Sequence, residues 1–177
     1  MKSLFSPNAS FAHDRGEPDP ALRATLAQAY SGGHEPYLRA VAELCTSRLL
    51  LPIVATGDDG GSGPDPDRQA EMAAVMVQAA DGSRGIVAFT GLDALTDWNP
   101  DARPVPCTLD DVAATAEETG SRVVLIDLQG PHSLVIEHAL VTELAQGHRL
   151  VEVSAGEFGW MVPNAADPDA EPGPSAG

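Results

Sequence analysis

Asp127 and His132 have the side-chain types that general acid–base chemistry requires, and they follow residues 123–128, the most hydrophobic stretch of the sequence. Loops after buried strands often hold ligand contacts. An aspartate that orients a histidine can make that histidine a competent base. In the alternative interpretation, Asp127 accepts N–H groups of the turn at Gly130 and Pro131, while His132 lies in solvent. We favour this alternative, and both residues remain candidates for ligand binding.

The sequence does not indicate a metal site. His138 would need a second ligand three or four residues later on a helix, where Val141 and Thr142 stand, and the adjacent Glu137 projects from a different side. The acidic stretch at residues 56–69 lacks the alternating ligands and closing glutamate of an EF-hand loop. We therefore expect neither a metal nor another cofactor.

Cys107 is the best candidate for a nucleophile, because it precedes an expected helix that begins near Thr108. A helix N-terminus can lower a thiol pKa, but no histidine is placed by sequence to serve this thiol. A buried, structural cysteine is the interpretation that we favour. The sequence also lacks a nucleophile elbow, a P-loop and a dinucleotide-binding glycine pattern. We therefore expect that the protein is not an enzyme.

Trp98 and Arg103 flank a proline-rich crossing at residues 99–106 and could line a shallow pocket. Aromatic packing in the core explains Trp98 equally well. Together with Asp127 and His132, these two residues complete the set for which we predict ligand binding.

The elements that position these residues begin with a helix at Asp19 and Pro20, a typical N-cap and first helical residue. Its expected apolar stripe consists of Leu22, Leu26, Ala29 and Tyr30. A second helix starts at Glu35 and Pro36 and leads into an apolar strand at residues 48–55. Pro52 cannot donate to a strand ladder, which predicts that this strand lies at an edge or carries a bulge.

Residues 72–80 and 85–90 are predicted to form an antiparallel hairpin that turns at residues 81–84, because Asp81 and Gly82 suit a tight turn. The first of these runs also fits helical spacing, and we favour the strand. A short helix at residues 91–98 follows, and Thr108 with Asp111 gives a capping-box pattern for the next helix.

In the last third of the chain, residues 123–128 are predicted to form the central strand, and residues 133–136 a short returning strand. A helix at residues 138–146 and a terminal strand at residues 150–153 complete the expected elements.

Composition indicates one domain with a sizeable core, because the 177 residues include 43% hydrophobic ones. We expect a domain at residues 19–162 with a flexible acidic loop at 57–68, between disordered segments at 1–18 and 163–177. A net charge of −16 disfavours nucleic acids and anionic membranes as partners. The N-terminus lacks the apolar core of a signal peptide, so reduced cysteines and a cytoplasmic location are expected.

Several blocks of the sequence resemble the SseB (enhanced serine sensitivity) family over roughly residues 20–153. The blocks are the helix running into the LLLPI strand, the segment VAFT to Trp98, and the strand that ends before Gly130 and Pro131. Relatives often have an Asn-Pro pair at the last position, where this chain departs. The resemblance implies an α+β fold of the family's N-terminal-domain type, a mixed, largely antiparallel sheet with helices packed against it.

The resemblance implies no catalytic residues, and the family name describes a growth phenotype. Two hypotheses about function follow: a non-catalytic regulatory or protein-interaction module, or a sensor that binds a small amino-acid-like metabolite near Asp127. We favour the first, with another protein as the partner. The sequence does not indicate an oligomeric state.

Overall fold

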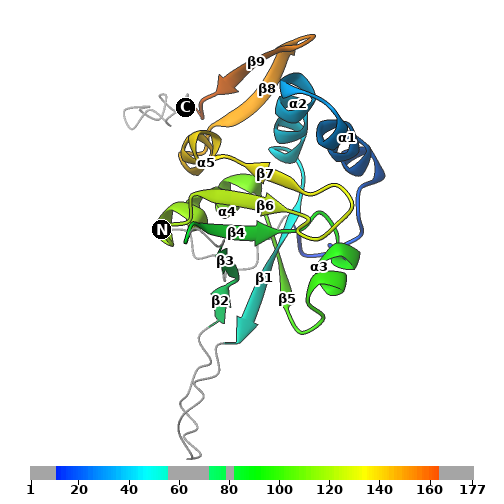
Figure 1. Cartoon of the computed structure of the whole chain (residues 1–177), viewed down its shortest axis with the longest axis vertical. Helices are drawn as coiled ribbons and strands as arrows, with labels where there is room; N and C mark the ends of the chain where they lie inside the picture. The colour runs from blue at the N-terminus through cyan, green and yellow to red at the C-terminus, as the bar shows by residue number, and fades with distance from the viewer. Residues whose placement is uncertain (1–10, 56–71, 79–81, 164–177) are drawn as a thin grey trace, which may run out of the picture.

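The protein has an α+β fold, and a computed structural model describes residues 11–55, 72–78 and 82–163 (Figure 1). Strands β4, β6 and β7 run across β1 and β5, and helices cover the resulting body. All strand pairs in the described residues are antiparallel except β4 with β6. The predicted fold class, with a largely antiparallel sheet, is therefore confirmed.

The first sheet has the order β2–β1–β5 and contains β1 (Leu49–Ala55), β2 (Met72–Ala74) and β5 (Arg103–Cys107). β1 is the middle strand, so the prediction that Pro52 marks an edge strand is wrong. Pro52 lies opposite Pro104 of β5, and on its other side its carbonyl accepts a hydrogen bond from the Val75 N–H at 3.2 Å. On this side of β1, Val75 separates β2 from β3 and belongs to neither strand. Pro52 therefore fits into β1 although β1 is not an edge strand and has no register shift.

The second sheet has the order β3–β4–β6–β7 and contains β3 (Met76–Gln78), β4 (Arg84–Ala88), β6 (Val123–Ile126) and β7 (Leu134–Ile136). β6 is an interior strand, as predicted, and β7 returns antiparallel beside it. The predicted hairpin is correct for β3 and β4, where Met76 pairs with Ile86. Residues 72–74 instead pair with β1, while residues 79–81 of the predicted turn lie outside the described residues.

The helices begin where local chemistry predicts. In α1 (Pro20–Ser31), the Asp19 side chain accepts a hydrogen bond from the Ala21 N–H at 2.8 Å. In α4 (Leu109–Glu118), Thr108 and Asp111 form the predicted capping box. The other helices are α2 (His34–Leu44), α3 (Leu92–Trp98) and α5 (His138–Ala145).

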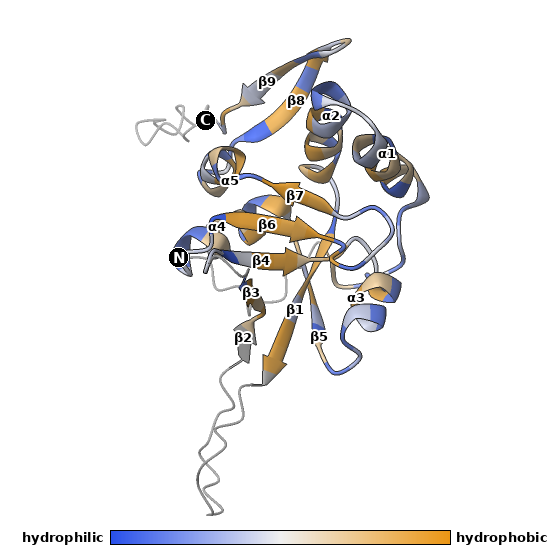
Figure 2. Cartoon of the chain, in the orientation of Figure 1, coloured by the Kyte–Doolittle hydropathy of each residue, from blue (hydrophilic) through white to orange (hydrophobic). Residues whose placement is uncertain are grey.

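The hydrophobic core lies between the sheets and helices, and its strands are strongly apolar in Figure 2. The inner faces of α1 and α4 contribute Leu22, Leu26 and Val112, and Phe89 is the largest fully buried side chain. Tyr30, predicted to belong to the inner stripe of α1, is 66% exposed and stands next to His132 instead.

Residues 11–18 pack on the domain, although their polar, proline-rich composition predicts disorder. Arg48 binds the Asp14 carboxylate at 3.0 Å and donates to the Glu17 carbonyl at 2.5 Å. Gly16 is buried, and its carbonyl accepts from the Leu92 N–H at 2.7 Å. Cations and backbone partners far along the chain order this segment, which composition alone does not reveal. The remaining predicted disordered residues, 1–10, 57–68 and 164–177, lie outside the described residues.

A two-stranded sheet of β8 (Arg149–Ser154) and β9 (Glu157–Met161) extends beside α2. The sequence predicts a strand at residues 150–153 in a domain that ends at residue 162, but it does not predict β9. Arg39 of α2 holds this hairpin through two hydrogen bonds to Glu152, at 2.7 and 3.0 Å. In the described part of the chain, no helix has the length and apolar character of a transmembrane segment.

Candidate functional site

An open pocket of about 230 Å³ lies between α1, α3 and the loop that joins β6 to β7. Side chains from two helices and one loop line it: Arg23 and Leu26 of α1, Asp93, Ala94, Asp97 and Trp98 of α3, and residues 127–132. Small-molecule sites usually occupy about 300–1,000 Å³. The size therefore suits a small metabolite or a single side chain of a larger partner.

Asp127 forms part of the pocket wall, and its own bonds are made to Thr90 at the end of β4. One carboxylate oxygen accepts the Thr90 N–H at 2.8 Å, and the other accepts the Thr90 hydroxyl at 2.7 Å. Asp127 is only 6% exposed and Thr90 only 1%. Both oxygens are thus committed within the protein, so Asp127 does not orient His132 as a base. The interpretation that Asp127 accepts N–H groups of the turn is wrong, because the N–H comes from Thr90, and His132 is half-buried instead of lying in open solvent.

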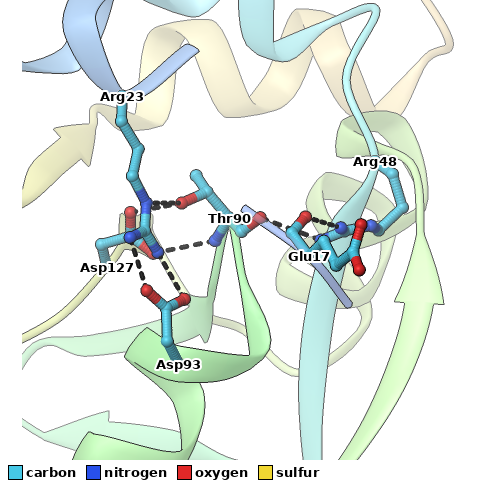
Figure 3. A network of polar contacts seen from close by, with 6 residues as sticks. All are labelled: Glu17, Arg23, Arg48, Thr90, Asp93 and Asp127. Carbon is cyan, nitrogen blue, oxygen red and sulfur yellow. Dashed lines mark hydrogen bonds and ion pairs between the residues drawn. The ribbon is translucent and has the colours of Figure 1, made fainter. Parts of the chain in front are cut away.

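Arg23 extends this polar network to α3 (Figure 3). Its terminal nitrogens donate to the two Asp93 oxygens at 2.6 and 2.7 Å, and its Nε donates to the Thr90 hydroxyl oxygen at 3.3 Å. The bond to Asp93 raises the pKa of Arg23, and the Arg23 guanidinium lowers the pKa of the Asp93 carboxyl. Every nitrogen of the guanidinium therefore already has an acceptor.

The loop after β6 has an unusual backbone. Asp127 and Gln129 have φ values of 49° and 66°, in the left-handed region that non-glycine residues seldom adopt. The Asp127 carbonyl accepts from the Gly130 N–H at 2.8 Å and from the Ser133 hydroxyl at 2.8 Å, which holds the turn closed. Backbone in this region costs roughly 1–3 kcal/mol per residue and persists where surrounding bonds fix it. The bonds to Thr90 and Ser133 supply that fixation.

The predicted site residues are brought together only in part. Asp127, His132 and Trp98 all line the pocket, whereas Arg103 lies in β5 and is not among the lining residues. Trp98 also packs on Phe89, with ring centroids 5.3 Å apart, so the core interpretation holds for one part of its surface. His132 is half-buried, and its ring makes a T-shaped contact with the ring of Tyr30, with the centroids 5.8 Å apart.

His138 and Glu137, which follow the same strand end in the sequence, lie outside the pocket lining at the start of α5. The His138 Nδ1 atom is 3.9 Å from a Glu117 oxygen. In the residues that the structure describes, no three histidine, cysteine or carboxylate groups converge as a metal site would require.

Cys107 is buried, and burial raises its pKa to about 12. The alternative of a thiol activated by the helix N-terminus is therefore wrong, because desolvation dominates. Cys45 is also buried, unpaired and shifted to a higher pKa by burial. Neither thiol is poised to act as a nucleophile.

Sequence reasoning missed Arg23, Thr90 and Asp93. The three come from segments far apart in the chain, and Arg23 occupies a helix position that an apolar stripe does not mark. The available signal was Thr90, a polar residue directly after the apolar run of residues 86–89. Such a residue needs a partner because an unpaired buried hydroxyl costs free energy.

Comparison with known families identifies the family of this chain. The family model "SseB protein N-terminal domain" matches residues 22–143, which include α1 to α5 except for the ends of α1 and α5. The chain belongs to the SseB family. A search of curated proteins and a search of solved structures gave no match. The pocket lies within the matched residues, whereas β8 and β9 lie beyond them.

Proposed function

We propose that this SseB-family domain is a non-catalytic regulatory module that binds another protein, and that the pocket between α1 and α3 takes part in binding. The observation that carries the proposal is the commitment of both Asp127 oxygens to Thr90. Catalysis needs a free base or nucleophile, an orienting partner and a group that stabilises developing charge. In the pocket, the orienting carboxylate and the guanidinium are already bound to other protein groups.

The pocket is also open and lies on rigid elements, which suits recognition. Its walls come from two helices, and its strained loop is fixed by bonds to buried and half-buried residues. A rigid surface loses little conformational entropy on binding. The buried, unpaired Cys45 and Cys107 suit a reducing compartment such as the cytoplasm, where we expect the protein to act.

The test is comparative capture of partners from a lysate of the source organism, with identification by mass spectrometry. Asp97→Arg reverses a charge in the pocket lining, and Glu118→Arg makes the same change on exposed α4, where Glu118 has no described partner. We expect specific proteins to be captured by the wild type and Glu118→Arg but lost with Asp97→Arg. Equal capture by all three would refute a role of the pocket in partner binding.

A second candidate function is sensing of a small amino-acid-like metabolite. The size of the pocket and its mixed charged and aromatic lining favour it. A ligand that binds only the native state raises the melting temperature by mass action. Screening the amino acids by thermal shift, with Asp97→Arg as the control, tests this candidate directly.

A further inference from the structure

Asp97 supplies the one carboxylate of the pocket lining that has no partner among the described residues. It shares the pocket-facing side of α3 with Asp93, one helical turn away. Asp93 is bound by Arg23, whereas the Asp97 carboxylate has no hydrogen bond or ion pair with any other described residue. It is also exposed, so its carboxylate is accessible to an incoming group.

The pocket as a whole carries negative charge. Three aspartates and one arginine line it, and Arg23 makes hydrogen bonds through all of its guanidinium nitrogens. An incoming carboxylate or phosphate would find three of the five N–H donors of Arg23 already bonded and would be repelled by Asp97 and Asp93. An incoming cation would gain from both the unpaired carboxylate and the excess of negative charge.

Trp98 adds a second element that cations prefer. It is the residue after Asp97, lines the same pocket and remains partly exposed while its other contacts are with Phe89. Cations bind favourably over indole faces, and arginine is the side chain most often found there. Phe89 packing and the α3 backbone fix the position of Trp98, so the ring is available without reorganisation.

We infer that this pocket receives the guanidinium or ammonium group of an arginine or lysine side chain of the partner protein, between Asp97 and Trp98. This inference rests on the proposed role in binding a protein. The pocket volume of about 230 Å³ suits a single side chain. The formal charge of −16 on the whole chain also attracts a basic partner.

The probe is a pair of blocked peptides, acetyl-Gly-Arg-Gly-amide and its citrulline analogue, which has nearly the same shape without the charge. Binding is followed through the indole N–H signal of Trp98 in nitrogen-15 NMR spectra, assigned with Trp98→Phe. We expect the arginine peptide to bind with about tenfold higher affinity, the combined effect of one exposed ion pair and one cation–π contact. Asp97→Asn should reduce its affinity by about threefold, the share of the ion pair, and leave the remaining preference over the citrulline peptide to the cation–π contact.

Asp101→Asn is the matched control, because Asp101 is exposed, its carboxylate has no described partner, and it lies outside the pocket lining. This variant should bind the arginine peptide as the wild type does, and thermal melts should show that both variants fold. Equal binding of the two peptides, or no binding at millimolar concentration, would overturn the inference.

Two further outcomes separate the sources of the cation and the two proposals. If free arginine bound more tightly than the blocked peptide, the assignment to a protein side chain would be wrong. If the peptides behaved as expected but Asp97→Arg left partner capture unchanged, the pocket would be a cation site and the proposed function would fail alone.

Discussion

Two arginine forks in this protein, each a bidentate pair of a guanidinium with a carboxylate, have bonds of similar length in different surroundings. Arg23 binds Asp93 at 2.6 and 2.7 Å, and Arg39 binds Glu152 at 2.7 and 3.0 Å. The first fork continues through Thr90 to Asp127, which is 6% exposed, whereas the second connects α2 to the exposed β8–β9 hairpin. Bond length is therefore a poor guide to how much each fork contributes to the stability of the fold.

Burial decides the contribution, because water competes for exposed charges and cannot reach buried ones. Removing a partner from a buried carboxylate leaves a charge that nothing solvates, which is the more costly change. The network around Asp127 should thus be sensitive to single substitutions, and the hairpin fork should be tolerant of them.

Thr90→Val should have the largest effect. It preserves the shape of the side chain but removes the hydroxyl that donates to Asp127 and accepts from Arg23. We expect a loss of about 2–4 kcal/mol in the free energy of unfolding, measured by urea denaturation. Thr96→Val is the control, since Thr96 is exposed and has no described partner; it should change stability by less than about 0.5 kcal/mol. Similar losses in the free energy of unfolding for both variants would contradict the greater sensitivity expected of the buried network.

Arg23→Met should have the next largest effect. The substitution keeps much of the apolar volume and removes the fork to Asp93, in which both groups are partly exposed. Solvent screening limits the expected loss to about 1 kcal/mol in the same measurement. Arg103→Met makes the same change at an exposed position of β5, where the side chain has no described partner. A cost at Arg103 as large as that at Arg23 would contradict the role given to the fork.

Arg39→Met should change stability less, because that fork is exposed to a similar degree but does not continue to a buried carboxylate as the Arg23 fork does through Thr90. Its effect is clearer in the titration of Glu152, whose pKa the Arg39 guanidinium, together with the Gly156 N–H, lowers to about 2. A carboxyl whose folded pKa is depressed adds stability above its ordinary pKa of about 4, and that stability is lost as the pH falls toward 2. Carbon-13 NMR of the Glu152 carboxyl should show its pKa return toward about 4 in Arg39→Met. An unchanged pKa would show that other groups hold it down.

The smallest expected effect on stability at neutral pH comes from the titration of Cys107, a buried thiol without an ionic partner. Burial raises its pKa to about 12, so the thiol should resist a thiol reagent at pH 8 and react only as the protein unfolds. A raised folded pKa adds stability that is present below the ordinary thiol pKa of about 8.5 and lost as the pH rises toward 12. Rapid reaction in the native protein would show that burial does not protect this thiol.

Local signals predicted much of the fold. The N-cap at Asp19, the capping box at Thr108 and the interior strand at Val123–Ile126 follow from residues close together in the sequence. The pairing of Met72–Ala74 with β1 did not follow, because turn chemistry near residue 82 says nothing about a break at Val75.

The site was predicted in part for the same reason. Asp127, Trp98 and His132 are marked by strand ends and residue types, and all three line the pocket. The bonds to Asp127 come from Thr90, two residues after β4, and Thr90 is in turn bound by Arg23 of α1. Such long-range pairing depends on the tertiary arrangement and leaves no local pattern, which is also why Arg103 was assigned to the wrong place.

The break at Val75 has a consequence for cooperativity. Residues on one side of it complete the first sheet beside β1, and those on the other side complete the second beside β4. Leu50 of β1 and Phe89 after β4 add a reciprocal pair of backbone bonds, at 2.8 and 2.9 Å. The chain at Val75 and these two bonds therefore connect the two sheets. We therefore expect the core amides of both sheets to share one rate of hydrogen exchange in a global opening, with the β8–β9 hairpin exchanging sooner.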